Sequence, residues 1–383
     1  MPTRTLTFAA ATLVAPLVCT AALKPYTGGD GTLWSAGGSW SSGVPTSGAD
    51  NVSLRSDTTS TGSTFDLADG FTITGLSAAA RSIDSSDGEA DHTINLNGRT
   101  LNVQGNLVVG QINGSNSTFD GAVRLDNGSL NLTNGNLDVG DRSSTTSNSS
   151  SAIGLLTGTN DAVFTSSNLA RLTAGTRGHA AGSTAEGTID FTGVAAGTLD
   201  VAAGTDNVLV GVRLGGSSSG NTTVGTVTLG SNWTSTTFGD STAARADFRV
   251  GSRNGNASVA GAFTQAGGSF SAYLDKWFVG YTSGGSESTT TTGTVDLTGV
   301  TSLAIDVNSL EIGPRNTNHS GTVTLPTGDV LINNAATIGG GTKGTLNLNR
   351  TDFAVASAAT LTLGTTGEVN STIGGVSAGI DIA

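Results

Sequence analysis

Arginine recurs two residues after a glycine that closes a short apolar run. The five positions are Arg142, Arg177, Arg213, Arg253 and Arg315. A guanidinium group binds carboxylate or sulfate through two parallel hydrogen bonds. Arginines stacked along one edge would therefore form a groove for acidic glycans. In the competing interpretation each arginine donates to carbonyls of its own loop or to a nearby aspartate, because stacked like charges repel one another.

Carboxylates gather in residues 84–92, which read DSSDGEADH. Oxygen ligands at such spacing could bind Ca²⁺, and the candidate ligands are Asp84, Asp87, Glu89 and Asp91. The segment lacks the ligand spacing and final glutamate of an EF-hand loop. We therefore favour a solvated acidic loop, and expect no metal and no other cofactor.

Catalytic motifs are missing from the sequence. No GxSxG, HExxH or P-loop pattern occurs, and the histidines His92, His179 and His319 are expected to lie in polar loops. A polysaccharide lyase or hydrolase would need clustered carboxylates. Outward aspartates are expected at Asp190, Asp200, Asp296 and Asp306, but the sequence alone does not show whether they face one another. We predict no catalytic residues, and keep a carbohydrate-active enzyme as the alternative.

The elements that would position these side chains repeat along the chain. Nine segments such as LVVG, LDVG and VLVG end in a glycine, and the glycines follow one another at about 32 residues, a period that indicates a solenoid or array. Each glycine is expected to turn the chain tightly or to adopt a positive φ. The nine are Gly110, Gly140, Gly175, Gly211, Gly251, Gly280, Gly313, Gly339 and Gly364.

Each unit contains three short runs in which apolar residues alternate with small or polar ones. Residues 344–364, GTLNLNRTDFAVASAATLTLG, show TLNL, FAVA and TLTL separated by short turns. Such alternation places one face of a strand inside, and stacked turns of chain can bury that face. The pattern predicts an all-β, right-handed, three-sided parallel β-helix of about nine to ten coils. Loop length varies mainly after the glycine, at one corner.

Two other architectures and one other function compete with this interpretation. A β-propeller needs four strands per blade, and the shortest units have room for three. A sandwich would use hairpin dipeptides, and Asn-Gly does occur at Asn97-Gly98 and Asn127-Gly128. An ice-binding face would need outward threonines in register on a flat side, and in the sequence the threonines do not hold one position through all units.

Composition and termini indicate an exported protein. The net charge of −12 and the 12% charged residues argue against a nucleic-acid-binding surface. Residues 1–22 resemble a signal peptide, with Arg4, an apolar run from Leu6 to Val18 and a small-residue cleavage site. Lipidation of Cys19, the single cysteine, is the alternative, although Val18 precedes it where lipoprotein signals have a small residue. The mature chain is expected to be secreted or on a bacterial cell surface, with no membrane span and no disulfide.

Residues 23–60 are expected to form an N-terminal cap built on Trp34, Trp40 and Pro45, with an aromatic sugar-binding platform as the alternative. Residues 61–383 are expected to be the repeat domain, truncated or continuing at its C-terminal end. That end resembles the start of another coil, which favours a downstream segment or end-to-end association with another chain.

The LxVG units with their GTxxL openers, and above all FRVGSRNGNASVAGAFTQAGGSFSAYLDKWFVG at 248–280, resemble the β-strand repeats of autotransporter-associated proteins and PEP-CTERM-type exported proteins of bacteria. The resemblance covers residues 34–364 and implies a cell-surface or extracellular rod without catalytic residues. This sequence differs from that family in lacking a C-terminal barrel or sorting helix. We therefore expect a non-enzymatic rod, adhesin or matrix component whose partners are surface polysaccharides or other cell-surface proteins.

Overall fold

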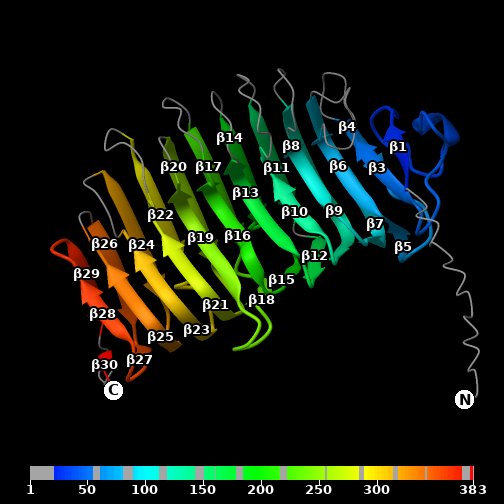
Figure 1. Cartoon of the computed structure of the whole chain (residues 1–383). Helices are drawn as coiled ribbons and strands as arrows, with labels where there is room; N and C mark the ends of the chain where they lie inside the picture. The colour runs from blue at the N-terminus through cyan, green and yellow to red at the C-terminus, as the bar shows by residue number, and fades with distance from the viewer. Residues whose placement is uncertain are drawn as a thin grey trace, which may run out of the picture.

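The computed structural model describes residues 21–54, 61–80, 89–111, 119–142, 151–159, 161–177, 184–215, 222–254, 257–283, 289–313, 318–340, 343–372 and 380–382. Its strands stack into an elongated parallel β-solenoid (Figure 1). The chain passes in turn through three parallel sheets, here named I, II and III, and then returns to the first. The three-strand unit predicted from the sequence is therefore confirmed.

Sheet I contains the strands that lead to the repeat glycines. Each strand pairs in parallel with the equivalent strand of the next coil. Its members are β1 (Ala22–Tyr26), β3 (Asp50–Leu54), β6 (Gly75–Ala80), β8 (Leu107–Gln111), β10 (Asn136–Val139), β13 (Arg171–Arg177), β16 (Gly204–Arg213), β19 (Ala246–Arg253), the second halves of β21 (Ser269–Val279), β23 (Ser302–Ile312) and β25 (Gly328–Ile338), and β28 (Thr360–Leu363).

Sheet II contains the strands that open on Gly-Thr or a similar pair. Its members are β2 (Thr32–Leu33), β4 (Thr61–Thr64), the first halves of β7 (Glu89–Val103) and β9 (Phe119–Thr133), β11 (Ala152–Gly158), β14 (Ala185–Phe191), β17 (Thr222–Leu229), β20 (Ser258–Gln265), β22 (Thr291–Asp296), β24 (His319–Leu325), β26 (Lys343–Asn349) and β29 (Gly367–Thr372).

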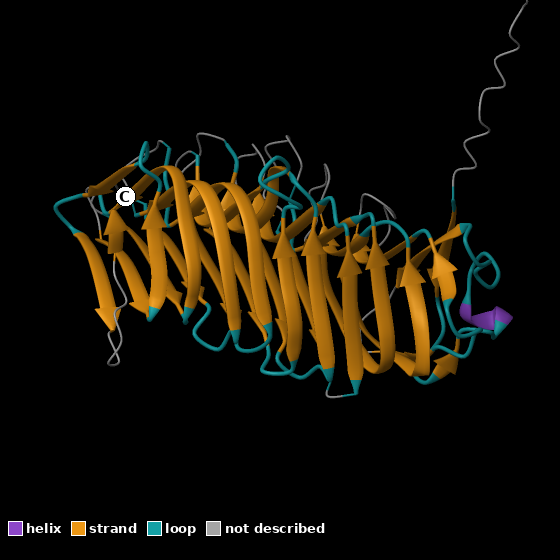
Figure 2. Ribbon diagram, turned by 90° about the horizontal axis from the view of Figure 1, so that it is seen from below, coloured by secondary structure: helices purple, strands orange, loops and turns teal. Residues whose placement is uncertain are grey.

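Sheet III closes each coil. Its members are β5 (Phe71–Ile73), the second halves of β7 and β9, β12 (Ala162–Ser167), β15 (Ala196–Val201), β18 (Trp233–Phe238), the first halves of β21, β23 and β25, β27 (Thr351–Val355) and β30 (Ile380–Ile382). The long strands β7 and β9 bend at Asn97 and Asn127, both with positive φ, so Asn-Gly marks a corner between stacked sheets and not a hairpin. Figure 2 shows successive strands side by side along the rod.

The alternation seen in the sequence becomes the core. In β17, Val227 and Leu229 are buried, while the alternate residues Thr226 and Thr228 face outward. Equivalent residues of every coil join one continuous hydrophobic cluster. In sheets I and II the described strands form twelve rungs, where the sequence predicted nine to ten coils. The added rungs arise because residues before the first recognised unit, including β1 and β3, also stack in register.

The N-terminal tryptophans are buried against the first rungs. Trp34 and Trp40 contact each other edge to face with ring centroids 5.3 Å apart, and Trp40 Nε1 donates to Trp34 O at 2.7 Å. Their exposed fractions are 0% and 4%. Neither ring therefore presents a face to a sugar, and both cover the apolar interior at this end. The short 3₁₀ helix η1 (Gly37–Ser39) lies between them.

Candidate functional site

A seam of glycines joins sheets I and II. Eight of the nine repeat glycines have φ between 55° and 64°, and Gly364 is the exception. This left-handed conformation favours glycine, which confirms the expected role for those eight. In nine of the twelve described sheet II strands, from β9 to β29, a second glycine lies against them: a Cβ on Gly225 would be 2.0 Å from Gly211 N and 2.1 Å from Ala174 O. The two sheets therefore touch backbone to backbone.

The seam divides the interior into two compartments. On β17, Thr223, Gly225 and Val227 all point inward, with Gly225 at the seam and Val227 in the hydrophobic core. Thr223 lies on the other side of the seam and is buried. Arginines of sheet I also lie beyond the seam, where Arg177, Arg213 and Arg253 occupy consecutive register positions. The arginine column predicted from the spacing therefore exists in the backbone.

The arginine side chains described in this column are buried. Arg142, Arg213 and Arg253 are 0%, 1% and 1% exposed. Arg213 Nε donates to Gly215 O at 2.9 Å, and Arg253 Nη1 donates to Ala257 O at 2.9 Å. Burial lowers the pKa of each guanidinium.

These three buried side chains therefore do not form an exposed groove for acidic glycans, and two of them, Arg213 and Arg253, donate to carbonyls of their own corner. The reason is the glycine conformation, which resets the alternation of the strand and directs the second residue after it inward. The side chain of Arg177 and all of Arg315 lie outside the described residues.

The prediction that His92 and His319 lie in polar loops is wrong, because His92 lies within β7, His319 begins β24, and both are buried. His319 shares the arginine compartment. Its Nε2 lies 3.2 Å from Arg253 Nη2, and Arg253 also donates to the hydroxyl of Thr289. Burial, followed by the charge of Arg253, lowers the pKa of His319 to about 4. The imidazole is therefore neutral at ordinary pH and accepts a hydrogen bond from the guanidinium.

The acidic segment is only partly described. Asp84 and Asp87 lie outside the described residues, Glu89 is described only as the first residue of β7, and Asp91 forms an ion pair with Arg124. His92 is fully buried, and its Nε2 lies 2.7 Å from Ser63 Oγ, which accepts from Trp34 Nε1 at 2.9 Å. Burial lowers the pKa of His92 to about 4. It supports the N-terminal aromatic cluster.

A buried charge cluster that the sequence does not reveal lies on sheet I. Arg171 Nη2 is 2.8 Å from Asp138 Oδ2 and 3.5 Å from Asp141 Oδ2, and Gln111 Nε2 donates to Asp141 Oδ2 at 3.2 Å. Both carboxylates are at most 3% exposed. Burial, with the charge of Asp138 added, raises the pKa of Asp141 to about 7. Only the register of β8, β10 and β13 brings these groups together.

The four outward aspartates considered for catalysis do not meet. Asp190 and Asp296 share one register column of sheet II but are three rungs apart, or roughly 14 Å at the usual strand spacing. Each instead accepts from the backbone and hydroxyl of the threonine two residues on. Asp200 and Asp306 are likewise three rungs apart on sheet III. Paired glycosidase carboxylates are closer than this.

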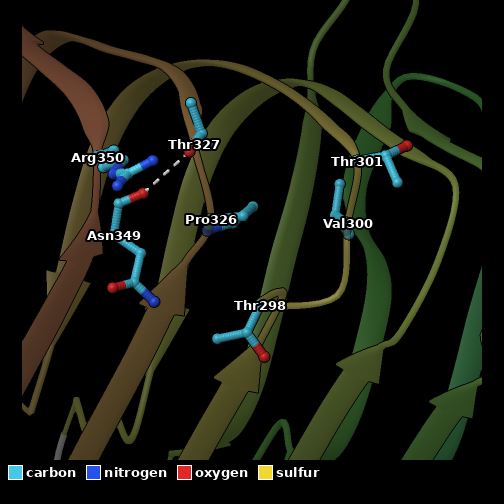
Figure 3. A pocket seen from close by; sticks show the side chains of 7 residues that line it. All are labelled: Thr298, Val300, Thr301, Pro326, Thr327, Asn349 and Arg350. Atoms are coloured by element: carbon cyan, nitrogen blue, oxygen red, sulfur yellow. Dashed lines mark hydrogen bonds between the residues drawn. The ribbon is translucent and has the colours of Figure 1, made fainter. Parts of the chain in front are cut away.

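Two neighbouring depressions lie where the coils shorten. The first, of about 480 Å³, follows the turns between sheets II and III (Figure 3). The loop between β22 and β23 is longer than those between β24 and β25 and between β26 and β27, so a notch opens beside it. Its donors and acceptors suit sugar hydroxyls and one anionic group. It is lined by Thr298, Val300, Thr301, Pro326, Thr327, Asn349 and Arg350.

The second depression, of about 370 Å³, continues over the outer face of sheet III on the same rungs. Tyr273 and Leu331 supply apolar surface, and Asp306, Asp329 and Asp352 supply carboxylates. Asp329 and Asp352 are direct register partners and both are exposed, which places their Cα atoms about 4.8 Å apart. In the sequence, the two aspartates are marked only by their spacing of 23 residues. That spacing indicates a pair only once the register between the two coils is known.

Among the described residues, no group of three or more His, Cys, Asp or Glu side chains could hold a metal ion. Within the same part of the chain, no helix is long and apolar enough to cross a membrane. Comparisons of this chain with protein-family models, with curated proteins and with solved structures gave no match. The function is therefore inferred from the fold and from the geometry of the described residues.

Proposed function

We propose that the chain is a secreted, non-enzymatic β-solenoid that serves as a cell-surface rod, adhesin or extracellular-matrix component. The observation that carries this is the continuous parallel pairing of strands from β1 to β28, with one apolar core along the whole stack. Such stacking suits a rigid spacer, about 55 Å long at the usual strand spacing. The signal-like first 22 residues and the resemblance to exported bacterial repeat proteins support the same extracellular or cell-surface location.

Surface polysaccharide is the partner that the depressions on β23, β25 and β27 suit best. The notch offers Arg350, an amide and several hydroxyls, and the adjoining groove offers the ring of Tyr273. A planar guanidinium binds a uronate or sulfate group, while a tyrosine ring packs on a sugar face. Other cell-surface proteins, or a second copy bound end to end, are further candidate partners of the rod.

A glycan array with matched variants tests this proposal. We expect the chain to bind acidic glycans and Arg350→Gln to lose that binding. Arg124→Gln is the control, because it removes the same charge from a partly exposed arginine that is paired with Asp91 on sheet II, away from the notch. Absence of binding by the unmodified chain, or equal binding by both variants, contradicts a glycan site at the notch. Cell fractionation and surface labelling test the address separately.

A carbohydrate-active enzyme is the second candidate, and the Asp329–Asp352 pair favours it. The Cα atoms of register partners on adjacent rungs are about 4.8 Å apart, which allows the two carboxyl groups to approach the roughly 5 Å separation that retaining glycosidases use. The measurement is release of reducing ends or unsaturated products from acidic polysaccharides. Turnover that disappears in Asp352→Asn supports the enzyme, and no turnover on a broad polysaccharide panel leaves the rod as the better interpretation.

A further inference from the structure

The notch and the adjoining groove meet on consecutive rungs of the solenoid. On β25, Thr327 lines the notch and Asp329 lines the groove, and at the start of β27 the same relation holds between Arg350 and Asp352. Two residues of extended chain span at most about 7 Å, which is shorter than a disaccharide. One glycan chain can therefore occupy the notch and the groove at the same time.

Arg350 gives the notch a positive charge. The residue is exposed, and within the described part of the chain its guanidinium group takes part in no ion pair or hydrogen bond. Its φ of 57° is left-handed, as at Asn97 and Asn127, which lie at corners between the same two sheets. An arginine adopts this conformation less readily than asparagine or glycine, and such strain collects at functional sites. Figure 3 shows Arg350 at the edge of the notch, beside Asn349.

The groove carries the opposite charge. Asp329 and Asp352 are exposed register partners, and among the described residues neither carboxylate has an ion pair or a hydrogen bond. Like charges directly opposite each other on neighbouring strands repel. The third carboxylate of the groove, that of Asp306, is already bound by Arg245 Nη2 at 2.8 Å. The groove therefore retains two adjacent negative charges, which one cationic group held between them would neutralise.

Apolar surface beside these charges suits the flat face of a sugar ring. Tyr273 and Leu331 stand in one register column of sheet III, with Asp306 between them, and Leu331 is 37% exposed. A pyranose ring has C–H groups on its faces and polar substituents at its rim. It can therefore pack on this surface while a substituent reaches the aspartates. A small cation alone would leave the surface of Tyr273 and Leu331 uncovered.

We propose that the two depressions together bind a zwitterionic polysaccharide, in which a sugar with an anionic group is followed by a sugar with a protonated amine. Arg350 binds the carboxylate, sulfate or phosphate of the first sugar, and Asp329 and Asp352 share the ammonium group of the second, through charge-assisted hydrogen bonds. An ammonium group donates three hydrogen bonds, which is enough for both carboxylates. This inference rests on the glycan binding proposed above and narrows the ligand to one chemical class.

Calorimetric titration of the full chain with matched oligosaccharides tests the proposal. The first probe alternates glucuronate with unacetylated glucosamine, at a pH where the amine is protonated. The second probe is the same compound after N-acetylation, and the third is a glucosamine oligomer without acidic groups. We expect the first probe to bind about tenfold more tightly than either of the others. The difference should shrink at high salt, because both ion pairs are exposed.

Three variants identify the groups involved. The double variant Asp329→Asn with Asp352→Asn should bind the first and second probes equally, and its melting temperature should not fall, because the change removes a repulsion. Arg350→Gln should weaken the binding of both acidic probes. Asp161→Asn is the matched control, since it removes an exposed carboxylate at the corner between β11 and β12, away from the groove. This control should bind as the unmodified chain does.

The outcomes separate this inference from the proposed function. Equal binding of the first two probes by the unmodified chain overturns the inference and leaves the acidic-glycan site standing. Absence of binding by either acidic probe removes that site, and the inference with it. A preference for free amines that survives in the double aspartate variant also overturns the inference. Tighter binding of an oligolysine peptide than of the first probe, lost in the double variant, makes a basic protein the occupant and refutes the polysaccharide.

Discussion

Replacing Gly225 with alanine is predicted to weaken the solenoid although it adds only a methyl group. The new Cβ would lie 2.0 Å from Gly211 N and 2.1 Å from Ala174 O. Both are backbone atoms of sheet I, where β13 and β16 pair in register, so neither can move aside without disturbing that pairing. Overpacking of a core costs about 1–3 kcal/mol, and contact with backbone on two sides places this variant near about 3 kcal/mol.

A nearby glycine provides the control. Gly204 begins β16, and a Cβ there would be 3.4 Å from the nearest side-chain atom, at ordinary contact distance and without a positive φ. Alanine at such a site stabilises by about 0.4–1 kcal/mol, because it restricts the unfolded chain. The two Gly→Ala changes are therefore expected to act in opposite directions.

Guanidinium denaturation followed by tryptophan fluorescence measures both effects, since buried Trp233 lies in the same coil as Gly225. We expect a lower midpoint for Gly225→Ala and an unchanged or higher midpoint for Gly204→Ala. Equal midpoints for the unmodified chain and Gly225→Ala would refute the seam as a backbone contact between sheets. Hydrogen exchange then shows whether the loss is confined to neighbouring coils, as nearest-neighbour stacking implies.

Three further predictions concern buried charges. The pKa of Asp141 is raised to about 7, so the folded state retains a proton that the unfolded chain releases near pH 3.8, and stability falls as pH rises from 3.8 through 7. The melting temperature of Asp141→Asn should not show this fall. If the melting temperatures of the variant and of the unmodified chain change in parallel from pH 5 to 8, the prediction is wrong. The lowered pKa of His92, about 4, acts oppositely, removing roughly 3 kcal/mol as pH falls from 6.5 to 4; His92→Gln should retain more stability at pH 4, and an equal acid loss would show that His92 is not responsible. The side chain of Arg245 is 11% exposed and donates to Leu274 O, Asp306 O and Asp306 Oδ1, which anchors the loop of residues 239–245 to the neighbouring coils. Arg245→Met should therefore speed amide hydrogen exchange in residues 239–245 while the other corners stay protected. Unchanged exchange in this loop would contradict the anchoring role of Arg245.

The repeat was readable from the sequence because its two signals are local. Alternation of apolar and small residues marks each strand, and a glycine marks the corner that needs a left-handed backbone. The Gly-Thr openers are visible in the sequence as well, but the reason for them is not. The structure supplies it, since Gly225 and its equivalents lie where a side chain would strike the opposite sheet.

The sequence did not predict the direction in which individual side chains point, nor which residues of different coils are register partners. The arginine spacing was correct, but the direction of Arg213 and Arg253 results from the backbone at the preceding glycine, which alternation alone does not reveal. The Asp329–Asp352 pair depends on which residues of different coils stand side by side. Variable corner loops hide that alignment until the sheets are assembled.

The direction of stacking has a mechanical consequence. Interstrand hydrogen bonds run along the rod, so a force that pulls its two ends apart loads all three sheets together at every rung. A force that peels the chain from one end meets the bonds of a single coil at a time. Such a molecule is stiff under axial tension. When the chain is pulled from one end, it unfolds coil by coil, so its length increases in steps.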